Sequence, residues 1–188
     1  MKSFSKPIFF ILTLSACFVF LFLDLAVSDQ ESSNISPEDR IFLENIVSAL
    51  QELPGTFESR PGPYVYMGPE KGMKRVTILV FSGRRSVFVK LGKVLDKHPE
   101  VSQGVISNLV ECLDQMKPSS TSLKGKPVPL GVMCYEALSS ICYYEAFDKD
   151  GGITEWEGTV LPDATESDLQ SSKKAWEIIV NERAYIRL

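Results

Sequence analysis

The sequence predicts an all-α, mainly helical domain. Two observations lead to this prediction: apolar residues recur at helical spacing in several segments, and prolines and glycines stand between those segments. The chain has 188 residues, of which 44% are hydrophobic and 23% are charged, so it can bury one core. We expect a single domain over residues 36–188, built as an irregular antiparallel helix array. Within it, residues 64–90 could also form a short strand or hairpin.

The first 28 residues have the features of an export signal or a membrane anchor. Lys2 and Lys6 precede an apolar stretch over residues 7–23. Three outcomes stay open. The chain could be cleaved behind Ala26-Val27-Ser28, or Cys17 could be lipidated, because Leu14-Ser15-Ala16-Cys17 resembles a bacterial lipobox. In the third outcome, about 20 residues remain as a membrane-spanning helix. All three predict an exported domain that is periplasmic, membrane-anchored or secreted.

A polar, serine-rich tether is expected over residues 29–35, and the first helix of the domain follows it. Ser36, Pro37 and the two acids behind them are typical N-terminal signals of a helix. Pro54-Gly55 is expected to end this helix. Residues 56–72 are rich in proline and glycine, so we expect an irregular loop in which Tyr64-Val65-Tyr66-Met67 could form a short strand.

The segment from residue 73 to residue 97 fits two structures. β-Branched residues on both sides of Gly83 favour a hairpin. Against this, apolar residues over 73–80 and again over 87–95 recur at helical spacing. We favour two helices that are joined at Gly83.

Three more helices are expected to complete the array. The first covers about residues 101–116, between two prolines. A loop over residues 119–127 follows, and Pro129 then starts the clearest helix, whose apolar stripe reaches Cys142. Beyond a turn-rich stretch, Thr165 and Asp168 predict a capping box, and the last helix is expected to end near Arg183.

Part of this pattern resembles a known architecture. Gly83-Arg84-Arg85-Ser86-Val87 leads into Leu91-Gly92-Lys93-Val94-Leu95-Asp96, and Leu109-Val110-Glu111-Cys112-Leu113-Asp114 repeats that ending. The arrangement resembles a HEAT-type helical repeat over about residues 72–144. Val128-Pro129-Leu130-Gly131 is also similar to helical modules of uncharacterised bacterial exported proteins. The resemblance implies stacked helical pairs that bind another macromolecule, and it transfers no catalytic residue.

Composition limits the classes of function. A net charge of -4 argues against a dedicated nucleic-acid binder, because binding phosphates needs an excess of Lys and Arg. One histidine and four cysteines offer little for a zinc site or a Ser-His-Asp triad. The acids between Asp148 and Glu155 are spaced somewhat like a calcium loop but in the wrong register, so we expect a solvated turn. We therefore predict no metal, no cofactor and no identifiable small-molecule substrate, and we do not favour an enzyme.

The cysteines allow two interpretations. Cys134 and Cys142 would lie about 12 Å apart along one helix, which is too far for a disulfide. In an oxidising compartment, Cys112 could pair with either of them and leave one thiol free. Alternatively, all three are reduced, buried and act as small apolar residues. We favour the reduced state.

Charge is unevenly distributed along the chain. Residues 71–97 hold eight basic residues against one acid, whereas residues 145–188 hold ten acids against five bases. The candidate basic face consists of Lys74, Arg75, Arg84 and Arg85, and it would suit anionic lipid headgroups or an acidic partner. We favour the simpler interpretation, in which these charges are solvated or attract the acidic half of the same chain.

Together these observations predict an exported or membrane-tethered helical protein that binds another protein or the membrane surface. One alternative is a thiol- or carboxylate-dependent hydrolase assembled from Cys134, His98 and Glu136. Another is a protein that is only a structural part of the cell envelope. No spacing of residues identifies the partner.

Overall fold

The computed structural model describes residues 35–66, 69–70, 72–145 and 156–188. The chain divides into two units after Arg40, and the architecture below is that of the second unit, Ile41–Leu188. The structure does not describe the predicted leader with Cys17, nearly all of the predicted tether, or the segment from Asp148 to Glu155 that was compared with a calcium loop.

The fold is mixed α/β, so the prediction of an all-α helix array is wrong. In chain order the elements are α2 (Pro37–Glu44), α3 (Ile46–Gln51), β1 (Gly55–Tyr66), β2 (Met73–Gly83), α4 (Ser86–Lys97), the short 3-10 helix η2 (Pro99–Val101), α5 (Ser102–Glu111), β3 (Pro118–Leu123), β4 (Lys126–Pro129), α6 (Leu130–Ser139), β5 (Cys142–Tyr143), α7 (Glu166–Glu182) and β6 (Ile186–Arg187).

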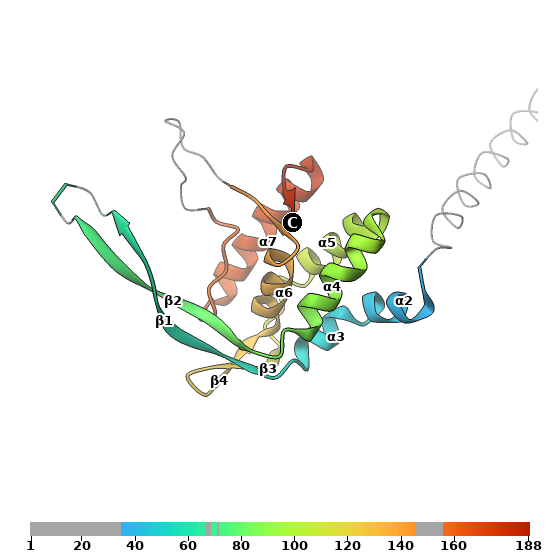
Figure 1. Ribbon diagram of the computed structural model, residues 1–188, viewed down its shortest axis with the longest axis horizontal. Helices are drawn as coiled ribbons and strands as arrows, with labels where there is room; N and C mark the ends of the chain where they lie inside the picture. Colours follow the sequence, from blue (N-terminus) through green and yellow to red (C-terminus); the bar gives the residue numbers. More distant parts are fainter. Residues whose placement is uncertain (1–34, 67–68, 71, 146–155) are drawn as a thin grey trace, which may run out of the picture. The chain divides into compact units, whose positions relative to one another are not determined.

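Four strands form one mixed sheet in the order β2-β1-β3-β4. β1 and β2 pair antiparallel over nearly their whole length, whereas β1 and β3 pair parallel only over residues 55–57 and 121–123. Among the described residues, the hairpin beyond Phe57 is therefore a two-stranded ribbon with no paired strand on either edge. Figure 1 shows this ribbon extending away from the helices, which gather at the other end of the sheet.

The predicted helix over residues 73–80 is a strand that pairs with β1, and this pairing places the buried Phe81 of β2 against the core. Phe81 lies opposite Phe57, and both side chains are buried. The β-branched residues Val76, Thr77, Ile78 and Val80 also favour an extended backbone. Gly83 consequently ends β2 and does not join two helices, so the HEAT-like arrangement is wrong as well.

The prolines that predicted a loop over residues 56–72 lie within β1. The register of β1 against β2 shifts between Pro61 and Tyr64, which marks a bulge. Proline lacks an N–H donor. At Pro61 and Pro63, the side of β1 that faces away from β2 has no paired strand among the described residues, so a missing donor on that side removes no hydrogen bond of the sheet.

The predicted loop over residues 119–127 is also wrong, because it forms β3, a tight turn and β4. Lys124 and Gly125 turn the chain with positive φ angles of 52° and 80°. Two polar side chains of β3, Ser119 and Thr121, are buried because they find partners. Ser119 Oγ donates to the carbonyl of Val128 at 2.9 Å, and Thr121 Oγ1 donates to the carbonyl of Leu53 at 2.7 Å.

The predicted helix starts are confirmed where local signals define them. Ser36 Oγ accepts a hydrogen bond from the N–H of Asp39 at the start of α2. At α7, Thr165 and Asp168 form the predicted capping box. α4, α5 and α6 also form within their predicted segments, and their apolar faces build the core together with Leu50 and Trp176.

A disulfide joins Cys112, at the end of α5, to Cys134 in α6, with 6.0 Å between their Cα atoms. The reduced state that we favoured for these two residues is therefore wrong. Cys142 stays free and buried. Gly131, one turn before Cys134, fits here because a Cβ at this position would collide with the carbonyl of Leu113. The disulfide thus closes a junction that is already tightly packed.

Candidate functional site

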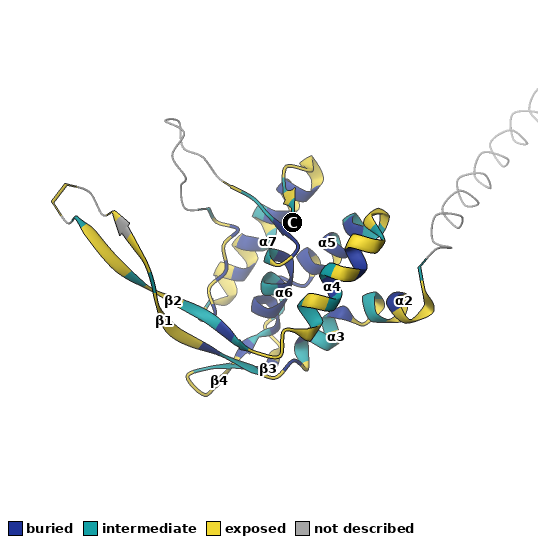
Figure 2. Cartoon of the chain, in the orientation of Figure 1, coloured by how far each residue is buried: buried dark blue, intermediate teal, exposed yellow. Residues whose placement is uncertain are grey.

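The exposed part of the β1–β2 hairpin is the candidate functional site, and we call it the arm. It comprises residues 58–66 of β1 and residues 73–80 of β2. Three large apolar or aromatic side chains at its outer end are mostly exposed: Tyr64 at 63%, Tyr66 at 62% and Met73 at 61%. Figure 2 shows exposure increasing along the hairpin from its buried base to this end.

Strand register places the exposed residues on defined faces of the arm. Tyr64 lies opposite Arg75, and Tyr66 lies opposite Met73. Because directly opposed residues of an antiparallel pair share a face, these four side chains lie on one side of the ribbon. Lys74, between Met73 and Arg75, therefore lies on the other side.

Arg75 is held in place beside a tyrosine. Its Nε donates to the carbonyl of Gly62 at 3.1 Å, and its Cζ lies 5.7 Å from the centre of the Tyr64 ring. This distance is within the range of a cation–π contact. The outer end of the arm therefore presents an aromatic surface with an adjoining positive charge.

The base of the arm is fixed by aromatic packing. The Phe81 ring packs edge-on against Phe57 at 5.7 Å and against Phe88 of α4 at 5.6 Å between ring centres. A Cβ at Gly83 would lie 2.9 Å from the carbonyl oxygen of Pro54, so the chain needs glycine where the arm meets the core. The core thus sets the direction in which the arm leaves it.

The four residues of the predicted basic face do not form one surface. Lys74 and Arg75 lie on the arm, whereas Arg84 and Arg85 follow β2 at its base. Most of β2 separates the two pairs, which is roughly 30 Å along an extended strand. Tyr64, Tyr66 and Met73 were not among the site residues that the sequence predicted. The sequence did allow a short strand over residues 64–67, which contains both tyrosines. The segment that pairs with it, β2, was predicted as a helix.

The residues of the alternative hydrolase are not assembled as a nucleophilic site. Cys134 Sγ is bonded to Cys112, so it is not a free thiolate in this state. His98 caps the end of α4, and its Nδ1 lies 3.4 Å from Glu100 Oε1. The sulfur that the alternative requires is therefore not available for attack.

Glu136 lies in a different setting, beside a cavity of about 240 Å³ whose lining includes Phe81, Arg85, Phe88, Ser139 and Ser140. Burial raises the pKa of the Glu136 carboxyl, and the positive charge of Arg85 partly opposes that rise. The hydroxyls of Ser139 and Ser140 donate to carbonyls within α6. Both serine hydroxyls that line this cavity are therefore engaged with the backbone of the helix.

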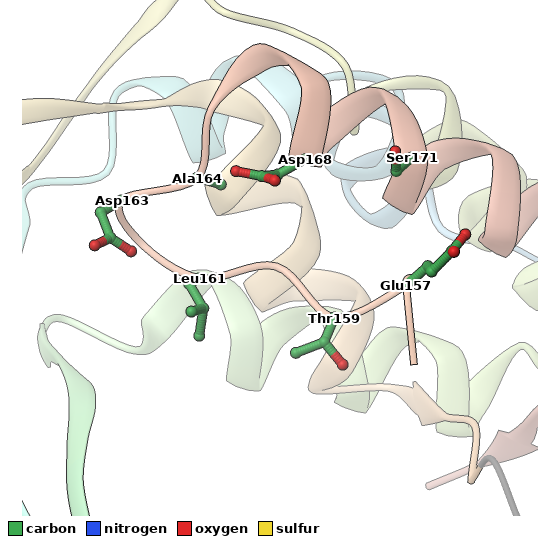
Figure 3. A pocket seen from close by; sticks show the side chains of 7 residues that line it. All are labelled: Glu157, Thr159, Leu161, Asp163, Ala164, Asp168 and Ser171. Carbon is green, nitrogen blue, oxygen red and sulfur yellow. The ribbon is translucent and has the colours of Figure 1, made fainter. Parts of the chain in front are cut away.

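A larger hollow of about 520 Å³ lies in front of α7, lined by Glu157, Thr159, Leu161, Asp163, Ala164, Asp168 and Ser171. Figure 3 shows Glu157 and Asp163 at opposite ends of the loop, with no carboxylate pointing at another. Asp168 is already engaged, because it accepts hydrogen bonds from the N–H and the hydroxyl of Thr165, both at 2.8 Å. Those bonds lower the pKa of Asp168. The hollow is thus part of a helix start rather than a pair of acids arranged for catalysis.

The described residues contain neither a metal site nor a membrane-spanning helix. Within the part of the chain that the structure describes, no group of three or more His, Cys, Asp or Glu residues is arranged to hold a metal ion. None of the described helices is long and apolar enough to cross a bilayer. Comparisons with models of protein families, with curated proteins and with solved structures find no significant match to this chain.

Proposed function

We propose that this protein is an exported binding protein that contacts its partner with the arm. The observation behind the proposal is that Tyr64, Tyr66 and Met73, each more than 60% exposed, share one end of a ribbon that extends beyond the core. Apolar groups gathered on an exposed surface are typical of a site that another molecule covers.

The architecture supports this role because the arm contributes little to the core. Isolated two-stranded ribbons are only marginally stable in water, and this one is long, with β1 and β2 spanning 12 and 11 residues. Folding alone would require only the base, where Phe57 and Phe81 are buried. A contact function explains the remaining length.

The disulfide supports the exported location. Disulfides form and persist mainly in oxidising compartments outside the cytosol. Cys112 and Cys134 are both buried in the core cluster, where they join α5 to α6 and serve structure. This fits the leader that the sequence predicts at residues 1–28.

Site-specific photocrosslinking in the native host tests the proposal. A photoreactive amino acid replaces Tyr66 in one variant and Leu161 in the control. The two positions are matched in exposure, at 62% and 60%, but only Tyr66 lies on the arm. We expect position 66 to form adducts, with protein or with lipid, and position 161 to form few. Equal yields at both positions would show that the arm is no preferred contact site and would overturn the proposal.

A further inference from the structure

We propose that the arm docks on an anionic lipid surface, an inference that rests on the proposed role of the arm as the binding element. The outer end combines Tyr64, Tyr66 and Met73 with the cations of Lys74 and Arg75. Tyrosine, with an apolar ring and a polar hydroxyl, is favoured at membrane–water interfaces. Lysine and arginine are attracted by anionic headgroups.

The length of the arm fits a protein that is itself acidic. The chain has a net charge of -4, so an anionic surface repels the protein as a whole. Met73 lies eight residues beyond the buried Phe81, which is roughly 27 Å along a strand. The Debye length at physiological salt is about 8 Å, so charges on the core are largely screened at that distance. The cations of the arm can therefore reach such a surface while the acidic part of the protein stays away from it.

The distribution of charge around the arm favours lipid over an acidic protein. Arg75 shares a face with the two tyrosines, whereas Lys74 lies on the opposite face of the ribbon. A folded partner would cover one face and leave the other cation in solvent. A fluid headgroup layer surrounds an inserted end, so that both cations find phosphates. Glu70, exposed in the turn, is an acid at the same end, and it leaves the two described cations in excess.

Fluorescence of the full-length chain on vesicles tests this inference. Tyr66 is replaced by an environment-sensitive fluorescent amino acid, and the protein is mixed with vesicles of neutral phosphatidylcholine or with vesicles that contain about 30 mol % phosphatidylserine. We expect a blue shift only with the anionic vesicles, and we expect salt to reverse it. The readout at position 66 reports docking of the arm whether or not the N-terminal segment also holds the chain on the vesicle.

Single-charge variants sharpen the test. Lys74→Gln removes one cation of the arm, and it should lower the ratio of docked to undocked protein about fivefold, as expected for one basic residue near an anionic surface. The matched control is Lys93→Gln, which removes the same charge from an exposed position on α4 and should leave the ratio unchanged.

The outcomes separate this inference from the proposed function. A blue shift that depends on anionic lipid and on Lys74 supports docking on lipid. An equal shift with neutral vesicles, or an equal loss in both variants, overturns recognition of headgroup charge. If no shift occurs while position 66 crosslinks to a protein in the host, the lipid inference fails and the binding role of the arm stands. If neither a shift nor a crosslink occurs, both proposals fail.

Discussion

The arm and the α6 region show two ways in which one chain fixes its structure. In α6, Leu130, Val132, Met133 and Cys134 are at most 2% exposed, so each side chain is held by neighbours from several elements. In the arm, Tyr64, Tyr66 and Met73 exceed 60% exposure, and strand register determines where they lie. Packing fixes the first region. Backbone pairing fixes the second and leaves its side chains free to meet another molecule.

The largest effect is expected from removing a buried ring of the core. Trp176 is 2% exposed, packs edge-on against Trp156 at 4.9 Å between ring centres, and donates from Nε1 to the carbonyl of Gly158 at 3.0 Å. Trp176→Ala should lower the free energy of unfolding by about 4 kcal/mol, because it leaves a cavity and removes one of the two hydrogen bonds to the Gly158 carbonyl, the other coming from the Ser172 hydroxyl. Urea denaturation measures this loss. Ile178→Ala, on the exposed face of the same helix, should change stability by no more than about 0.5 kcal/mol. Similar losses in both variants would contradict the packing of α7.

The next effect comes from the disulfide. Replacing both Cys112 and Cys134 by alanine should lower the free energy of unfolding by about 3 kcal/mol, because the bond closes a loop with a sequence separation of 22 residues. Reductant should destabilise the wild-type protein by a similar amount and leave the double variant unaffected. If reductant leaves the melting temperature of the wild-type protein unchanged, the bond is not formed.

A smaller effect on stability, which depends on pH, is expected at Glu136, beside the cavity of about 240 Å³. Its folded-state pKa is raised above the ordinary value of 4.5, mainly by burial. The folded state therefore binds the proton more tightly than the unfolded state, and the carboxyl costs stability as the pH rises from its unfolded-state pKa through its folded-state pKa. Glu136→Gln should raise the melting temperature at about pH 7, and the gain should disappear as the pH falls below the ordinary value of 4.5.

The exposed Glu177 on α7 supplies the control for this comparison. Glu177→Gln, measured over the same pH range, gives the part of the gain that comes only from removing one negative charge from the protein. A constant gain from Glu136→Gln at all pH values would show that the effect comes from packing and not from ionisation.

The smallest effect on stability is expected at the end of the arm. Tyr66→Ser should change the free energy of unfolding by no more than about 0.5 kcal/mol, because the ring is mostly exposed. The same change should reduce binding on anionic vesicles, measured by flotation of the full-length chain. By contrast, Phe57→Ala at the base should cost about 3 kcal/mol or more. Comparable losses at both positions would show that the arm is part of the core.

Local signals predicted the helices because those signals act within one or two turns. The capping box of Thr165 and Asp168 is an example, since both residues and both hydrogen bonds lie within four residues of chain. Among the strand pairs, the pairing of β1 with β3 is the one that local signals cannot predict, because the two strands are distant in the sequence. β1 was obscured by Pro61 and Pro63, and its pairing with β3 joins residues such as Gly55 and Thr121. No local spacing specifies such a contact.

The candidate site was only partly predictable for the same reason. Lys74 and Arg75 were identified as basic residues, but their grouping with Arg84 and Arg85 was based on charge along the sequence, and most of β2 separates the two pairs. Tyr64 and Tyr66 gain their significance only when β2 brings Met73 and Arg75 opposite them. The disulfide was one of two pairings that the sequence left open, and the contact between α5 and α6 selects Cys134.

By itself, the sequence determined where several helices start, as at Ser36 and Thr165, and which residues are apolar enough to be buried, because propensity and capping act over a few residues. Only the tertiary structure decided that residues 73–83 form a strand, that Cys112 bonds Cys134, and that three aromatic and apolar side chains end up exposed at the end of one ribbon. The physical reason is that some segments are compatible with both helix and strand. Such a segment adopts the structure in which residues outside it can pair with its backbone and bury its apolar side chains.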